Sequence, residues 1–151
     1  MKSYEELNQL TCRYDSDCYM QFLEDNGEDI DNLDWEYRFK LIKDLYTRAK
    51  YCTEIGYFLH DEVRDFFIPK FELENIKTNI KFDINGKITV YRGVNKYNLK
   101  NGCSYTLDKS KAEWFANRYG DGGYVIEKEI TVDDIVFYDN SRKEQEVFLK
   151  Y

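Results

Sequence analysis

Two glutamates two positions apart open the last apolar segment of the chain. Glu144 and Glu146 flank Gln145 and precede Val147-Phe148-Leu149. Residues two apart in a strand point to the same face, so the pattern predicts two neighbouring carboxylates at the start of a strand. Ionising both carboxylates costs free energy unless a cation or a hydroxyl donor lies between them. Paired carboxylates that carry this cost are typical of catalytic sites. The alternative is a solvated strand end in a Glu-rich chain.

An arginine and two hydroxyls offer groups that complement these carboxylates. Arg92 ends a predicted strand and can bind a phosphate with two parallel N–H donors, and Gly93 after it allows another group close to the backbone. Ser104 and Thr106 are again two apart, so both hydroxyls can orient a carboxylate or a ribose. Taken singly, each of these residues is also typical of an ordinary strand.

The order and surroundings of these residues resemble one enzyme family. The matching segments are Tyr91-Arg92-Gly93, Ser104-Tyr105-Thr106-Leu107-Asp108 with the Ala112–Ala116 stretch behind it, and Arg142–Val147. They resemble the Arg-Ser-Glu class of mono-ADP-ribosyltransferases, which includes cellular arginine transferases, bacterial toxins and phage-encoded members. The resemblance covers roughly residues 88–151. It implies a transferase that uses NAD as a substrate and needs no metal.

The resemblance also implies which residues bind NAD. Arg92 would hold the diphosphate and the nicotinamide ribose, and the backbone of Gly93 would approach the nicotinamide amide. Ser104 would hold the nicotinamide end and the catalytic glutamate, with Thr106 supporting it. An aromatic ring stacks on nicotinamide in such sites, and the candidates are Phe115, Tyr119 and Tyr124.

The two glutamates take different roles in this family. Glu146 would hydrogen-bond the ribose 2'-hydroxyl and stabilise the oxocarbenium ion that forms as nicotinamide leaves. Glu144 would orient and deprotonate the acceptor, which implies arginine as the modified residue. The loop before this pair contacts the target protein in the family, and here the corresponding residues are Tyr138, Asn140 and Arg142.

Two other functions are compatible with the same residues. The protein could be an acidic binding protein that keeps the transferase fold and inhibits a partner, or an NAD glycohydrolase that transfers ADP-ribose to water. The retained arginine, serine and glutamate favour the transferase, since a binding protein has no need of all three. A small effector of a phage or toxin type, acting on another organism's proteins, is the expected setting.

The elements that must position these residues divide the chain into a helical half and a strand-rich half. Ser3 and Glu6 form a capping-box pattern for a helix expected to run to about Glu24. An acidic loop is expected over residues 25–32, followed by a long helix from Asp34 to about Cys52 and a helical piece over residues 61–67.

The second half changes to a period of two. Strands are expected at residues 80–84, 88–91, 104–107, 124–130, 135–138 and 145–149, with a hairpin turn at Asn85-Gly86 and a helix capped by Asp108. The predicted fold is a single α+β domain over residues 1–151. The resemblance implies that a helical lobe (1–79) packs on a mixed, β-sandwich-like ADP-ribosyltransferase core (80–151) that binds NAD.

Composition limits the partners and the location. The 22 basic and 29 acidic residues give a net charge of -7, which argues against binding to nucleic acid or to anionic lipid. No apolar run follows Met1 and none is long enough to cross a bilayer, so we expect a cytoplasmic protein, in its own cell or in an infected host. Four cysteines without a Cys-x-x-Cys pair and one histidine predict no structural zinc site.

Overall fold

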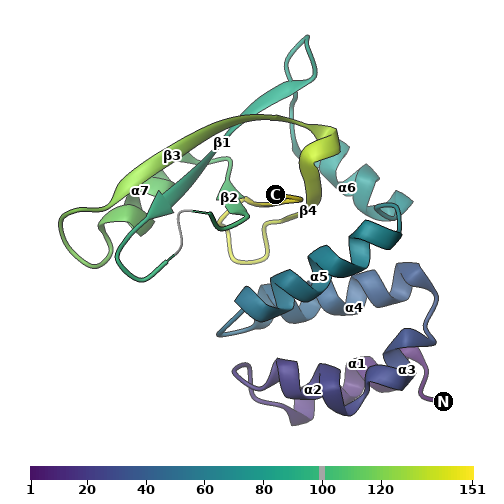
Figure 1. The fold of residues 1–151 in the computed structure, drawn as a ribbon. Helices are drawn as coiled ribbons and strands as arrows, with labels where there is room; N and C mark the ends of the chain where they lie inside the picture. The colour runs from purple at the N-terminus through teal and green to yellow at the C-terminus, as the bar shows by residue number, and fades with distance from the viewer. Residues whose placement is uncertain (99–100) are drawn as a thin grey trace. The chain divides into compact units, whose positions relative to one another are not determined.

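The structure is a computed structural model that describes residues 1–98 and 101–151. The chain forms two compact units, Met1–Pro69 and Lys70–Tyr151 (Figure 1). The structure confirms an α+β protein: helices make up the first unit, and two helices with an antiparallel sheet make up the second. None of the helices within the described residues is long and apolar enough to span a bilayer.

The first unit contains only helices, and its core is formed by their apolar faces. Its elements are α1 (Tyr4–Leu10), η1 (Thr11–Arg13), α2 (Tyr19–Asp25), α3 (Gly27–Asp31), α4 (Trp35–Arg48) and α5 (Thr53–Asp65). The fully buried side chains at the centre include Leu7, Phe22, Phe39, Leu45 and Leu59.

The capping box at Ser3 is confirmed, but the prediction of one helix to Glu24 is wrong. The Ser3 hydroxyl accepts from the Glu6 amide at 3.2 Å, and the Glu6 carboxylate accepts from the Ser3 amide at 3.4 Å. Helix α1 ends at Leu10, and the 3-10 helix η1 that follows ends at Arg13, because Tyr14 is extended (φ -111°, ψ 136°). The residues that follow, Asp15-Ser16-Asp17, form a turn instead of a helix, since short polar side chains compete for backbone hydrogen bonds.

Three further features of the first unit differ from the sequence prediction. The segment expected to be an acidic loop contains the short helix α3. The long helix starts after Asp34 as predicted but stops at Arg48, where Ala49 turns extended (φ -68°, ψ 141°), so Cys52 belongs to the next connection. Helix α5 then covers Thr53–Asp65, a longer helix than the piece expected over residues 61–67.

The sheet of the second unit has the strand order β3-β1-β2-β5-β4, and every pair is antiparallel. The prediction of a mixed, sandwich-like core is therefore corrected to a single antiparallel sheet. Its strands are β1 (Lys87–Val94), β2 (Ser104–Thr106), β3 (Tyr124–Thr131), β4 (Ile135–Asp139) and β5 (Glu146–Leu149), with η2 (Val132–Asp134) before β4. These strands match those predicted from residue 88 onward to within one or two residues at most ends.

The strand predicted over residues 80–84 does not form, although the Asn85-Gly86 turn does. The Asp83 carboxylate accepts from the backbone amides of Asn85 and Lys87 at 2.8 and 2.9 Å, and the Asp83 carbonyl accepts from Gly86 at 2.9 Å. Gly86 has φ +75°, which favours glycine. In place of the expected partner over residues 80–84, β1 pairs with β3 from Lys87↔Thr131 to Val94↔Tyr124, and with β2 on its other side.

Helix α6 (Lys70–Asn79) covers the outer edge of β4. The Asn75 side-chain amide donates to the Tyr138 carbonyl at 2.9 Å, and the Tyr138 amide donates to the Glu72 carboxylate at 3.3 Å. Asn75 also donates to Glu72 at 2.8 Å. Ile76 of the same helix joins the core of the second unit with Val90, Tyr105, Ile130 and Val147. Helix α6 therefore packs with the sheet, although it lies within the range expected to be the helical lobe.

Candidate active site

Three neighbouring strands bring Arg92, Ser104 and Glu146 together. Strand β2 lies between β1 and β5, with Tyr91 opposite Thr106 and Thr106 opposite Glu146. Arg92 Nη1 donates to the backbone carbonyl of Ser104 at 2.8 Å. The Ser104 hydroxyl donates to Glu146 Oε2 in a short hydrogen bond. The arginine, serine and glutamate singled out in the sequence thus form one hydrogen-bonded chain.

Glu146 is half-buried at the start of β5, and its environment favours the protonated form. Burial raises the pKa of its carboxyl from the ordinary 4.5 to about 7, and the nearby charges of Asp139 and Glu144 act in the same direction. The hydrogen bond from Ser104 and the charge of Arg142 lower the same pKa. At neutral pH the two protonation states of Glu146 are therefore close in free energy.

Asp139 is a neighbour of Glu146 that sequence analysis missed. It ends β4 and stands directly across from Glu146 in the antiparallel pair. Its charge raises the pKa of Glu146. The signal was present in the sequence, because two strands joined by a short polar loop predict a hairpin, and hairpin pairing places the last residue of one strand beside the first of the next.

Glu144 lies outside the strand, so the prediction that both glutamates alternate onto one strand face is wrong. Strand β5 begins at Glu146, and Gln145 is left-handed with φ +46°. Thr106 binds this segment, since its hydroxyl donates to the Glu144 carbonyl at 2.6 Å and accepts from the Asp108 amide at 3.1 Å. Thr106 therefore connects the Glu144 backbone to the start of α7 (Lys109–Asn117).

Gly93 lies where β1 passes under α7. A Cβ atom at this position would overlap the carbonyl oxygen of Ala112 and meet the amide nitrogen of Ala116 at 2.7 Å. The same position lies 2.9 Å from the Cβ of Phe115. A side chain at residue 93 would therefore push the helix away from the strand.

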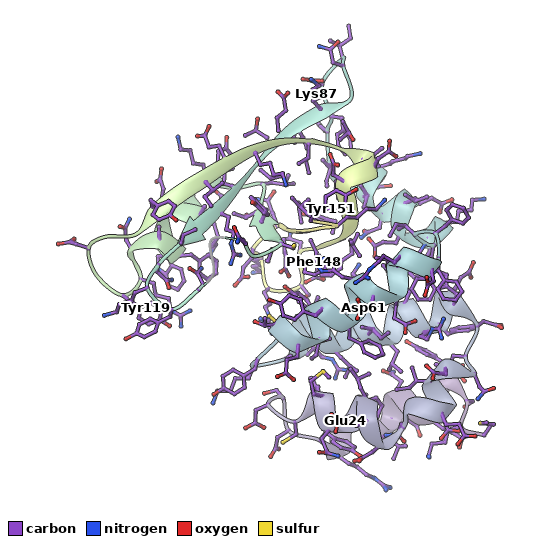
Figure 2. All side chains as sticks on the ribbon, viewed as in Figure 1. Glu24, Asp61, Lys87, Tyr119, Phe148 and Tyr151 are labelled. Carbon is purple, nitrogen blue, oxygen red and sulfur yellow. The ribbon has the colours of Figure 1, made fainter. Side chains whose placement is uncertain are left out.

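Of the three aromatic candidates for nicotinamide stacking, Phe115 is the one in contact with Gly93. Phe115 is half-buried, and its carbonyl accepts from the Asn95 side chain at 3.0 Å. Tyr119 follows the end of α7, and its ring packs edge-on against Tyr97 at 4.6 Å. Tyr119 and Lys87 lie at opposite ends of the β1–β3 ladder (Figure 2). Tyr124 is half exposed at the start of β3.

Gly102 is a second residue that sequence analysis missed. A Cβ atom there would overlap the guanidinium group of Arg92. The absence of a side chain at residue 102 therefore gives Arg92 the space to reach the Ser104 carbonyl. A glycine two residues before the predicted Ser-x-Thr was the available signal, but only the fold shows which group it accommodates.

The loop residues expected to contact a target differ in exposure. Tyr138 is buried in the core of the second unit, so it offers no surface to a partner. Asn140 and Arg142 are exposed. Tyr105, the middle residue of the Ser-x-Thr segment, is buried in the same core, while Ser104 before it binds Glu146.

The outer face of α7 carries an open depression of about 410 Å³. It is lined by Ser110, Glu113, Trp114, Asn117 and Arg118, none of which belongs to the hydrogen-bonded chain of Arg92, Ser104 and Glu146.

Among residues 1–98 and 101–151, no group of three or more His, Cys, Asp or Glu side chains is placed to hold a metal ion.

Comparison of the sequence with protein-family models and with curated proteins, and of the structure with solved structures, found no match.

Proposed function

We propose that this protein is a mono-ADP-ribosyltransferase that moves ADP-ribose from NAD to arginine on a target protein. The observation that supports this most is the hydrogen-bonded chain from Arg92 through Ser104 to Glu146, which joins a guanidinium group to a carboxylate with a raised pKa. The proposal includes an ADP-ribosyltransferase core built from the second unit, and action in the cytoplasm of the protein's own cell or of a host.

In the proposed reaction, Arg92 binds the diphosphate of NAD and Ser104 orients Glu146. The bond between ribose C1' and the nicotinamide nitrogen breaks, and its electron pair neutralises the pyridinium as nicotinamide leaves. Ionised Glu146 stabilises the positive charge that develops on the ribose, a charge larger in the transition state than in bound NAD. An arginine nitrogen then bonds to C1', and Glu144 accepts the proton that this nitrogen loses.

A direct test uses NAD labelled on the adenylate portion, incubated with the protein with and without a cell lysate. Transfer labels discrete lysate proteins, whereas hydrolysis releases nicotinamide without labelling any. Absence of nicotinamide release and of NAD binding in both samples would refute the enzymatic proposal. Mass spectrometry of the labelled peptides then identifies the acceptor residue.

Two substitutions separate the proposed roles of the glutamates. Glu146→Gln should lower both transfer and nicotinamide release by about 100-fold or more, because the charge that stabilises the transition state is gone. Glu144→Gln should lower arginine transfer while part of the nicotinamide release remains, because water needs less activation by this group. Glu74→Gln, at an exposed position of α6, serves as the control. Equal transfer by both site variants and the control would contradict the assignment.

A second candidate, an acidic binding protein, is favoured by the distribution of charge. The first unit holds 8 Lys and Arg against 16 Asp and Glu, whereas the second holds 14 against 13. The excess negative charge therefore lies in the unit that carries none of the proposed site residues, where it fits a basic partner. Salt-sensitive capture of a basic protein by the Glu146→Gln variant would support this function, with or without catalysis.

A further inference from the structure

We infer that Asn140 is a positioning residue that holds Gln145 in its left-handed conformation and thereby sets the placement of Glu144 relative to Glu146. This inference rests on the proposed function for its catalytic consequence. We expect Asn140 to influence how much ADP-ribose is transferred to a protein acceptor and how much to water.

The loop between β4 and β5 folds around Asn140. The Asn140 backbone carbonyl accepts from the Lys143 amide at 3.0 Å, and the Asn140 side-chain oxygen accepts from the Gln145 amide at 3.0 Å. Lys143 and Gln145 have φ values of +58° and +46°, and both carry a Cβ atom. The left-handed region is unfavourable for such residues, so the surrounding hydrogen bonds must hold them there.

The conformation of Gln145 decides where Glu144 lies. If residue 145 were extended, β5 would continue backwards and strand alternation would bring Glu144 onto the face of Glu146. Instead, the Thr106 hydroxyl holds the Glu144 carbonyl at 2.6 Å and the Leu107 amide donates to the Gln145 carbonyl at 3.2 Å. With the Asn140 bond to the Gln145 amide, the peptide units around Gln145 are fixed from both sides.

Glu144 and Glu146 nonetheless remain electrostatically coupled. Burial and the charges of Asp139 and Glu144 raise the pKa of Glu146, whereas the Ser104 hydrogen bond and the charge of Arg142 lower it. A change in the position of Glu144 will therefore appear in the titration of Glu146. This titration reports the geometry without any need for turnover.

The test compares Asn140→Ala with the double variant Asn140→Ala, Gln145→Gly. Asn140→Ala removes the acceptor for the Gln145 amide, so the ratio of arginine transfer to nicotinamide release should fall about tenfold, with the KM for NAD unchanged. Glycine adopts positive φ without support, so Gln145→Gly should restore the ratio in the double variant to within about threefold of wild type. Asn140→Asp keeps the side-chain oxygen, so its ratio of arginine transfer to nicotinamide release should stay close to that of the wild type.

Two controls distinguish positioning by Asn140 from a direct contact with the target and from the mere loss of a surface asparagine. Asn117→Ala removes an exposed asparagine whose side-chain amide donates to the Glu113 backbone carbonyl within α7, and it should leave the ratio unchanged. If Asn140 contacted the target protein directly, glycine at residue 145 would not rescue Asn140→Ala, and that result would overturn the inference. An unchanged ratio in Asn140→Ala would overturn it as well.

Carboxylate NMR makes the inference independent of the proposed function. The Glu146 titration should shift in Asn140→Ala and return in the double variant. If the wild-type protein does not turn over NAD, the proposed function fails, while the positioning role is still decided by this titration. Identical Glu146 titration in the wild type, in Asn140→Ala and in the double variant would overturn the inference.

Discussion

Glu146 has two competing requirements at the scale of a single residue. The proposed chemistry needs its carboxylate ionised, because only the charged form stabilises a developing ribosyl cation. Burial in the sheet favours the neutral form and is the largest cause of its raised pKa, about 7. The hydrogen bond from Ser104 and the charge of Arg142 act in the opposite direction. The fraction of protein with an ionised Glu146, the form that the proposed reaction requires, therefore depends on pH near neutrality.

We predict that kcat/KM for nicotinamide release rises with pH and levels off above a pKa of about 7. Below that pKa the rate should increase about tenfold per pH unit, because one proton must leave Glu146 in the free enzyme. Initial rates at constant ionic strength from about pH 5 to about pH 9 measure this profile. A rate that stays flat or falls across the interval contradicts the prediction.

The same ionisation has the opposite effect on stability. The folded pKa of Glu146 lies above its ordinary value of 4.5, so folding favours the protonated form. Protonation of Glu146 adds up to about 3 kcal/mol to the free energy of unfolding. This contribution is complete below about pH 4.5 and is lost as the pH rises through about 7. Urea unfolding of the wild type and of Glu146→Gln at several pH values isolates this contribution, which the variant should lack.

At the scale of elements, the packing of α7 on β1 depends on a glycine. The contacts at Gly93 are with the backbone of Ala112 and Ala116, which cannot rotate away as a side chain can. Gly93 has no positive φ, so the requirement for glycine is one of space and not of backbone conformation.

Gly93→Ala should lower the free energy of unfolding by about 1–3 kcal/mol, the usual cost of forcing an extra carbon into a packed interior. Gly27→Ala is the matched control, because a Cβ atom at Gly27 meets nothing within 4 Å at the start of α3. It should leave stability unchanged or raise it by up to about 1 kcal/mol. Urea unfolding measures both, and equal stability of the two variants would count against the packing argument.

Local patterns predicted many of the elements and part of the site. Asp108 caps α7 by accepting from the Ser110 amide at 2.9 Å, as its residue type indicates. The β-strand pattern also brought Arg92, Ser104 and Glu146 into consideration, and the sheet places them on adjacent strands. Each of these elements depends on residues close in sequence.

The features that were missed depend on contacts between distant residues or on competing local bonds. The alternation at residues 80–84 was outweighed by the Asp83 carboxylate, which binds the turn amides. Gln145 is an unremarkable strand residue by type, and its left-handed conformation follows from the acceptor on Asn140. The need for glycine at residue 102 follows only from the folded structure, in which the guanidinium of Arg92, ten positions earlier, lies against it.

At the scale of the whole molecule, the division at Pro69 separates two kinds of structure. The first unit is helical and strongly acidic, and the second contains the sheet and nearly balances its charges. The segment between α5 and α6 carries Phe67, whose side chain is 94% exposed. Its carbonyl accepts from the indole of Trp35 at 2.6 Å, a contact within the first unit.

We predict that brief digestion with chymotrypsin cleaves first beside Phe67, since exposed loop segments are the preferred sites of nicking. The expected products are fragments near residues 1–67 and 68–151, identified by intact mass. Phe67→Ala should slow this cleavage, because the enzyme prefers aromatic residues. First cuts within β1, β3 or β5 would contradict the prediction, because they would show that the sheet opens more readily than the segment at Phe67.

The bonds from α6 to β4 also bear on how copies of the chain behave at high concentration. Strands β3 and β4 are the two edges of the sheet. The β3 edge carries Glu127, Lys128 and Glu129, whose charges disfavour pairing with another strand. Strand β4 is apolar over Ile135-Val136-Phe137-Tyr138, and α6 covers it through Glu72 and Asn75. Any change that detaches α6 therefore exposes an aggregation-prone edge, so solubility should decline before the arrangement of Arg92, Ser104 and Glu146 changes.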